Sequence, residues 1–295
     1  MCEIKNNPFH PKRPQKRTII ALNRLKKKDK CYFRAYPSSW KVMRPLIFVT
    51  NDDGISSKGI RSLVSVAEEF GEVCIIAPDK PQSGMGHAIT VNGILRLDKS
   101  RLFEGLNAYT CSGTPVDCVK LGIYELLKRK PDLILSGINH GENTSTNVLY
   151  SGTMSAAVEG AMENIPSVGF SLCDHSSEAD FTGAQHVARQ VIAAMLKNTF
   201  PSNVCINVNV PNLPPKEIKG IRVARQAHAF WEDRFDKRFD QFGKPYYWLT
   251  GEFMNQNPSA DTDLQAIEEG YASLVPTQFD MTAYTAMDEF KKWNL

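Results

Sequence analysis

The chain has 295 residues, a formal net charge of +3, 42% hydrophobic residues and 23% charged residues, values typical of a soluble globular protein with one large or two modest domains. No stretch approaches ~18 consecutive apolar residues, which excludes a membrane-spanning helix. The seven cysteines are scattered and form no Cys-x-x-Cys pair, which favours a reducing, cytoplasmic location over a disulfide framework or a zinc site.

The charge is divided unevenly along the chain. Residues 1–44 contain 13 Lys or Arg and two acidic residues, whereas the other 251 residues contain 22 basic and 30 acidic ones. The body is therefore acidic, and we expect no nucleic-acid-binding surface on it. Residues 1–42 are basic and contain prolines but no apolar signal core, which predicts a disordered leader outside the fold. A start codon placed too far upstream of Met43 would explain it, and a functional basic arm is the alternative.

The stretch 46–54 organises the rest of the chain. Leu46–Thr50 is apolar or β-branched and predicts a strand buried on both faces. Asn51-Asp52-Asp53-Gly54 then favours a turn, and apolar residues at helical spacing predict a helix over 58–70. Ligands bind at such strand ends in open α/β sheets, so Asp52 and Asp53 are candidates for a divalent metal site. Helix capping or turn stabilisation by one of them is the alternative.

From Pro45 to residue 210 strands alternate with helices, which predicts an α/β core (43–210) with a mostly parallel sheet and helices on both faces. We expect the further strands at 73–77, 131–136, 167–171 and 204–208, and helices at 115–127, 154–162 and 182–196. The segments 88–91, 94–97 and 108–111 look extended and suggest an antiparallel insertion.

Residues 211–295 differ in character, because aromatic residues cluster there and the spacing is irregular. We interpret the region as hairpins and an arm that ends in a helix near 283–293. Such an aromatic surface fits subunit contacts in an oligomer. A small subdomain that closes the core of the monomer is the alternative.

Polar loops follow several of the predicted strands and should converge at one edge of the sheet. They offer carboxylate, hydroxyl and amide oxygens, the ligands of Mg²⁺, Mn²⁺ or Ca²⁺, in the ranges 51–54, 79–86, 112–114 and 137–143. Ser151-Gly152-Thr153 opens a helix, whose free N–H groups can hold phosphate. A divalent metal beside an anion site points to hydrolysis of phosphate esters.

Six motifs in this order resemble the SurE family of stationary-phase survival proteins, which are metal-dependent 5′-nucleotidases. They are 50–54 (TNDDG), 77–79 (APD), 82–84 (QSG), 112–115 (SGTP), 136–143 (SGINxGxN) and 150–153 (YSGT). The resemblance extends from Met43 to the C-terminus. It implies a Rossmann-like core and a C-terminal part exchanged between subunits of a homodimer or homotetramer. It also implies hydrolysis of nucleoside monophosphates, and in some members of short polyphosphate.

The resemblance also implies roles for individual residues. It places one divalent cation per subunit, Mg²⁺ or Mn²⁺, on Asp52, Asp53, Ser83 and Asn139. Around the phosphate it places Asn51, Gly84, Asn143, Ser151, Gly152 and Thr153. Lys80-Pro81 stands where Arg-Asn is frequent in the family, and His87 follows the Ser-Gly loop, so substrate preference is left open.

Several other interpretations compete with these. His87 and His140 could transfer a proton, although packing within their loops is the more common role of such residues. Trp231 could stack on a base, but core or interface packing is the better explanation. A receiver-like Mg²⁺-binding signalling module also carries adjacent acids after its first strand, but it needs an Asp where this chain has Ser136-Gly137. A halo-acid-type phosphatase needs Asp-x-Asp, whereas these acids are adjacent, which favours direct attack by water.

Overall fold

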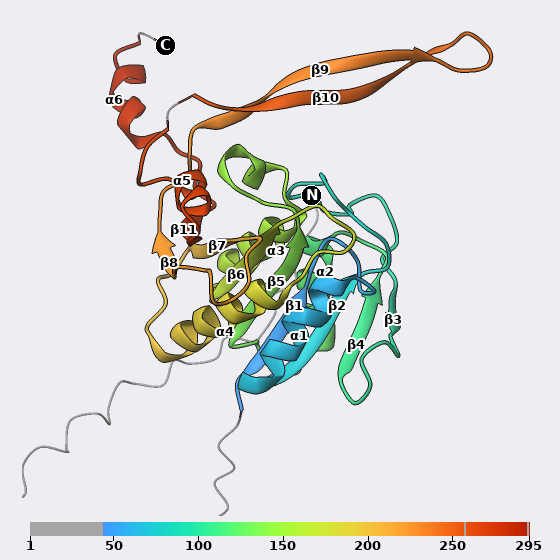
Figure 1. Ribbon diagram of the computed structural model, residues 1–295. Helices are drawn as coiled ribbons and strands as arrows, with labels where there is room; N and C mark the ends of the chain where they lie inside the picture. Colours follow the sequence, from blue (N-terminus) through green and yellow to red (C-terminus); the bar gives the residue numbers. More distant parts are fainter. Residues whose placement is uncertain (1–43, 257, 294) are drawn as a thin grey trace, which may run out of the picture. The chain divides into compact units, whose positions relative to one another are not determined.

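The computed structural model describes residues 44–256, 258–293 and 295 (Figure 1), so the expected leader at 1–42 lies outside the described residues. Nine strands form the central sheet: β1 (Leu46–Thr50), β2 (Glu72–Pro78), β3 (Leu97–Lys99), β4 (Asn107–Cys111), β5 (Leu133–His140), β6 (Ser167–Cys173), β7 (Val204–Pro211), β8 (Ile221–Val223) and β11 (Ala272–Gln278). Their order is β3-β4-β2-β1-β5-β6-β7-β11-β8. The strands from β4 to β7 are parallel, while β3 and β11 run antiparallel to their neighbours β4 and β7. The mostly parallel α/β sheet is thus confirmed.

Helices cover both faces of this sheet. One face packs against α1 (Lys58–Phe70) and α4 (Thr182–Lys197). The other packs against α2 (Pro115–Leu121), which continues into a π-helical turn over Gly122–Leu126, and α3 (Gly152–Met162). None of the described helices is long and apolar enough to cross a bilayer.

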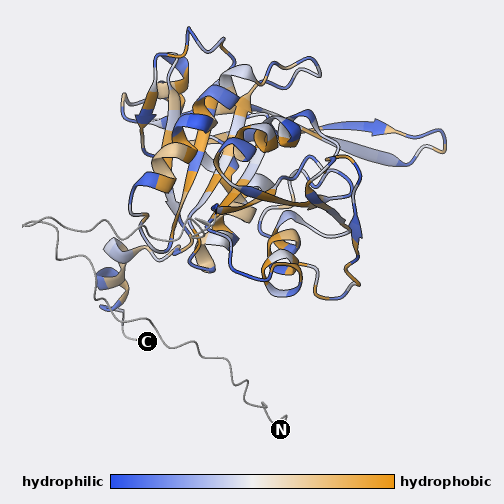
Figure 2. Ribbon diagram, turned by 90° about the horizontal axis from the view of Figure 1, so that it is seen from below, coloured by the Kyte–Doolittle hydropathy of each residue, from blue (hydrophilic) through white to orange (hydrophobic). Residues whose placement is uncertain are grey.

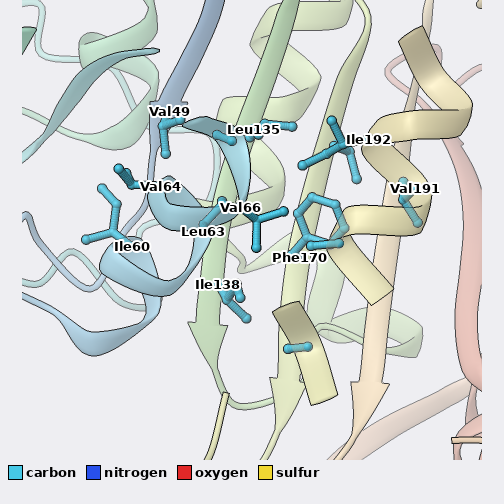
Figure 3. Packing of buried hydrophobic residues seen from close by; sticks show 14 of the residues in the cluster. Val49, Ile60, Leu63, Val64, Val66, Leu135, Ile138, Phe170, Val191 and Ile192 are labelled. Carbon is cyan, nitrogen blue, oxygen red and sulfur yellow. The ribbon is translucent and has the colours of Figure 1, made fainter. Parts of the chain in front are cut away.

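The core explains why the strongly patterned segments fold as expected. All five residues of β1 are buried, and the apolar residues of α1 recur every three or four positions so that one face turns to the sheet. Figure 3 shows Leu63 of α1 and Ile192 of α4 on the same side of the sheet as Phe170 of β6. Figure 2 shows the apolar strands enclosed by helices whose outer surfaces are hydrophilic.

Three expectations need correction. Within the described chain, 88–91 is not a strand, because Thr90 bonds the side chain of Asp117 instead of a neighbouring strand. The second expected segment, 94–97, is a strand only from Leu97 onwards, as β3. The single last helix is instead a 3₁₀ turn (Tyr284–Ala286) followed by α6 (Met287–Phe290).

The C-terminal region both completes the sheet and forms a separate hairpin. Strands β8 and β11 join the central sheet, and α5 (Asp263–Glu268) precedes β11. Strands β9 (Ala229–Phe239) and β10 (Pro245–Asn255) pair with each other over eleven residues each (Figure 1), and almost all of their residues are exposed or half-buried. A hairpin arm is therefore present, and its use in oligomerisation stays a prediction.

Candidate active site

The turn after β1 is held by Asn51. Its amide donates to the carbonyl of Gly54 at 3.1 Å and to Oγ of Ser57 at 2.8 Å, and Ser57 in turn caps α1. Gly54 has φ +90°, a conformation that an L side chain rarely adopts. Among the described residues, the buried Oδ1 of Asn51 has no hydrogen-bond partner. Asn51 thus shapes the acidic turn, and one buried oxygen there stays available.

Asp52 lies against the start of α3. Its side chain is buried, and Oδ1 accepts a 2.5 Å hydrogen bond from Oγ1 of Thr153. A Cβ placed on Gly152 would lie 2.7 Å from Cβ of Asp52, so a glycine is required for the helix to approach this closely. The residues that the sequence assigned separately to metal and to phosphate therefore meet here.

Both carboxylates are difficult to ionise in the metal-free protein. Burial raises the pKa of Asp52, and bonds from the Thr153 hydroxyl and from the amides of Thr153 and Gly152 oppose that rise. Burial, and then the neighbouring charge of Asp52, raises the pKa of Asp53 to about 6, although the amide of His140 opposes this from 3.2 Å. Two adjacent acids that repel each other in a desolvated place are what a divalent cation would neutralise.

Ser83 comes to this edge on the loop that follows β2. The amide of Gln82 donates to the carbonyl of Asp52 at 2.8 Å, which places the next residue beside the acidic turn. The Ser83 side chain is exposed and makes no hydrogen bond with any described residue. Gly84 follows with φ +74°, and a Cβ there would meet nothing within 4 Å.

Asn139 reaches the same edge through an irregularity in β5. The pairing register with β6 shifts between Ser136 and Asn139, and such bulges redirect side chains. Its amide nitrogen donates to the carbonyl of Gly141 at 2.7 Å, which leaves Oδ1 as the free acceptor. The next residue, His140, bonds Oδ2 of Asp53, so Asn139 and Asp53 belong to one hydrogen-bonded corner.

The other residues expected at the phosphate take different positions. Ser151 is the N-cap of α3 and accepts from the amide of Met154 at 3.0 Å. The side-chain amide of Asn143 is buried and donates to Oγ of Ser171 at 2.8 Å, within a network that also includes Asn207 and Asn209. Ser151 and Thr153 therefore frame the helix start beside Asp52, while Asn143 secures the loop after β5.

The two candidate histidines have partners within the fold. Nε2 of His140 lies 2.5 Å from the carbonyl of Ser176, and its ring lies near Phe181. Nε2 of His87 lies 3.0 Å from Oε2 of Glu159. These contacts favour packing over proton transfer. Glu159 was not singled out in the sequence, although a lone acid inside the small and apolar helix 152–162 was a usable signal.

The donor set fits a hard cation. Carboxylate, hydroxyl and amide oxygens come from two loops and from the end of β5, and they are the ligand types that Mg²⁺ and Mn²⁺ prefer. In the described part of the chain, no three His, Cys, Asp or Glu side chains gather as a ligand cluster would. Only a set completed by neutral oxygens such as those of Ser83 and Asn139 suits this edge.

Comparison with known proteins places this geometry in a family. Residues 47–233 match the family model described as survival protein SurE. The chain is 56% identical over 253 residues to the 5′-nucleotidase SurE of Flavobacterium johnsoniae, with 85% of this chain and 98% of the relative covered. The chain belongs to the SurE family. A second SurE relative named 5′-nucleotidase, from Bacteroides fragilis, is 46% identical over the same shares of both chains.

A solved SurE structure has the same fold. The crystal structure of the SurE protein from Aquifex aeolicus matches with a TM-score of 0.74 and 38% identity, over 84% of this chain and 98% of that one. The family assignment therefore rests on both sequence and structure. In the SurE fold of this chain, Asp52, Asp53 and Ser83 lie in loops after β1 and β2, while Asn139 lies in the last residues of β5.

Proposed function

We propose that this SurE protein is a metal-dependent phosphatase that hydrolyses nucleoside 5′-monophosphates to nucleoside and phosphate. The observation that carries the proposal is the pair Asp52 and Asp53, two desolvated acids with raised pKa values beside the amino terminus of α3. The names of the SurE relatives support the reaction class. Hydrolysis of 3′-monophosphates and of short polyphosphate are further activities to test.

Asp52, Asp53, Ser83 and Asn139 would hold one Mg²⁺ or Mn²⁺ per subunit. When bound, such a cation acidifies a water molecule and stabilises the negative charge that develops on phosphorus. The geometry supports this set because the backbone bonds at Gln82 and His140 bring their loops to the acidic turn. Ser83 and Asn139 make no bond with another described residue at the oxygens that they would offer.

The remaining residues would orient the reactants. Thr153 would fix the orientation of the Asp52 carboxylate by its direct hydrogen bond to Oδ1. The amino terminus of α3 adds a positive dipole end beside the phosphate, near Ser151 and Gly152. Asn51, Gly84 and Asn143 would complete the phosphate site by shaping their loops or lining them.

The test compares Asp52→Asn and Asp53→Asn with the unchanged protein on a panel of nucleotides with Mg²⁺ or Mn²⁺. We expect both variants to lose on the order of a thousandfold in kcat/KM, since the metal contributes several kcal/mol to the barrier. Asp98→Asn, on exposed β3, is the matched control and should keep full activity. Unchanged turnover in both site variants would end the metal assignment.

A receiver-like signalling module is the competing function, and acetyl phosphate separates the two. A stable aspartyl phosphate would favour the receiver, whereas release of inorganic phosphate supports the hydrolase. The strand β5 continues into Ser136-Gly137 where a receiver needs its phosphorylated Asp. This observation favours the hydrolase.

We also propose that the protein works in the cytoplasm as a homodimer or homotetramer. The five cysteines of the described chain are free thiols, as expected in a reducing compartment. The hairpin β9–β10 exposes many large apolar side chains, which fits a subunit contact.

A further inference from the structure

The loop that carries Ser83, residues 80–91 and here named the Ser83 loop, is bonded to the core at both ends. Near its start it bonds the carbonyl of Asp52, and near its end Thr90 bonds the carboxylate of Asp117 through both its amide and its hydroxyl. Between them, the Gly86 amide donates to the carbonyl of Tyr150, and the Ala88 carbonyl accepts from Thr114. Besides these bonds, one side-chain contact connects the middle of the loop to α3.

Glu159 of α3 makes this side-chain contact with His87. The carboxylate is 2% exposed, with Oε1 2.5 Å from Nζ of Lys120 and Oε2 3.0 Å from Nε2 of His87. Burial raises the pKa of Glu159, but the bonds from His87 and Lys120 outweigh burial and leave this pKa below its usual value. A buried, ionised carboxylate thus joins α3 to α2 and to the Ser83 loop.

Burial of a carboxylate costs free energy that its partners must offset, and those partners are partly exposed here, Lys120 by 40% and His87 by 36% of the side chain. The bond to Lys120 joins two helices, whereas the bond to His87 reaches the Ser83 loop. We propose that Glu159 and His87 form a clasp that positions the Ser83 loop, and with it the Ser83 hydroxyl, over the acidic turn. The clasp rests on the proposed function, since it assumes that Ser83 is a metal ligand.

Helix α3 connects the clasp to the acidic turn. Gly152, two helical turns before Glu159 and therefore on the same side of α3, packs directly on Asp52. One rigid element thus contacts Asp52 at one point and the Ser83 loop about 10 Å further along. Because α3 fixes both, the clasp sets the distance between two donors that lie on different loops.

The geometry also separates this role from acid–base catalysis. A positioning His87 needs only a hydrogen-bonding side chain that reaches Glu159, and glutamine can supply one. A proton-transferring His87 needs an imidazole, which glutamine cannot replace. Under the positioning hypothesis His87→Ala is impaired and His87→Gln is not. Under the proton-transfer hypothesis both variants are impaired.

The first experiment measures Mn²⁺ affinity by electron paramagnetic resonance, together with kcat and KM for a nucleoside monophosphate. In His87→Ala we expect Mn²⁺ affinity to fall about tenfold, as for other residues that orient metal ligands. In His87→Gln both affinity and kcat should stay within about twofold of the unchanged protein. His186→Ala, a partly exposed histidine on α4 across the sheet, is the control and should change nothing.

The second experiment needs no metal and measures hydrogen exchange of the metal-free protein. In His87→Ala and Glu159→Ala, the peptide that contains Gly86 should exchange faster, because the middle of the loop has lost its side-chain contact with α3. Thr90 should stay as protected as before, since Asp117 holds it independently. Its peptide serves as an internal control for global unfolding.

Two results would overturn the clasp. One is unchanged exchange at Gly86 in both variants. The other is a loss of kcat in His87→Gln as large as in His87→Ala, with Mn²⁺ affinity unaltered in both, which would assign His87 to proton transfer. Should Asp52→Asn bind Mn²⁺ as well as the unchanged protein, the proposed metal site fails, while the exchange measurement still decides whether the clasp exists.

Discussion

The carboxyl edge of the sheet and the β9–β10 hairpin differ in which side chains are buried and which are exposed. At the edge, polar groups are buried and bonded across distant parts of the chain, as Thr153 is to Asp52. Along the hairpin, large apolar side chains are exposed, with 67% of Phe235, 60% of Trp248 and 78% of Phe242 accessible to solvent. Its backbone bonds run mainly between its own two strands.

The contrast indicates which region is complete within one chain. The candidate metal donors and the helix start beside them all come from a single subunit and lie in one hydrogen-bonded corner. The hairpin leaves apolar area in water, at roughly 25 cal/mol for each Å² that a partner could cover. We therefore expect the chemistry to be carried within the subunit and the hairpin to serve assembly.

Of the changes that test this division, replacing apolar residues of the hairpin should have the largest effect, and the effect should be on the mass of the assembly. In Phe235→Ser/Trp248→Ser, we expect light scattering to report a smaller assembly, because the contact would lose two large aromatic side chains of the kind that dominate binding energy. Mn²⁺ affinity per subunit should stay unchanged. Leu102→Ser, which removes one isolated exposed leucine, is the control. An unaltered mass for the double variant would contradict an assembly role for the hairpin.

Removing the charge of Asp53 should have an intermediate effect, on the free energy of unfolding. The dependence of this effect on pH tests whether the raised pKa of Asp53 causes it. The pKa of Asp53 lies near 6 in the folded protein against an ordinary value of 3.8, so the folded state binds this proton more tightly than the unfolded state. The metal-free protein therefore loses stability as pH rises from about 4 through 6. Asp53→Asn should be more stable than the unchanged metal-free protein at pH 8, by on the order of 1 kcal/mol, and no more stable at pH 4.

Thermal unfolding with a chelator present measures this difference, and about 2–4 °C is expected for a domain of this size. Saturating Mn²⁺ should reverse the order, because only the unchanged protein gains from the cation. A variant that is less stable than the unchanged metal-free protein at pH 8 would show that Asp53 contributes through its hydrogen bond with His140 more than it costs through charge.

The sequence predicted one of these regions better than the other. The turn at Asn51–Gly54 was predictable because a buried strand, turn residues and an amphipathic helix follow one another, and each signal is local. For residues 211–295 the sequence predicted hairpins and an arm but not the bounds of their strands. Apolar and polar residues do not alternate regularly along a strand such as β9, because neither face of the hairpin packs on a core. Period-2 patterning cannot appear where burial does not impose it.

Contacts between distant residues set a second limit. The pairing of Thr153 with Asp52 joins residues 101 positions apart, and that of His87 with Glu159 joins residues 72 apart. Residue type suggested a metal at the acids and an anion at the helix start. Only the fold shows that the same helix start bonds the first acid, and that a buried glutamate lies within hydrogen-bonding distance of His87.

The smallest predicted effect concerns the hydrogen bond that connects the hairpin to the segment before α3. Nε1 of Trp231, in β9, donates to Oδ1 of Asn147 at 2.8 Å, and Asn147 lies in the 3₁₀ turn Ser145–Leu149 that leads into Ser151 and α3. Trp231→Phe removes this one exposed bond, which is worth about 0.5–1.5 kcal/mol. We expect a drop of a few degrees at most in thermal stability, with kcat and KM within about twofold of the unchanged protein.

Trp248→Phe on the opposite strand is the matched control, since that exposed indole makes no hydrogen bond with any described residue. If the hairpin and the site are energetically independent, both variants should keep the same turnover. A selective loss of kcat in Trp231→Phe, measured at a temperature where both variants are folded, would instead mean that the hairpin acts on the site through the 3₁₀ turn. In that case assembly and chemistry would be coupled at Asn147, and the division between the two regions would lie within the hairpin, beyond Trp231.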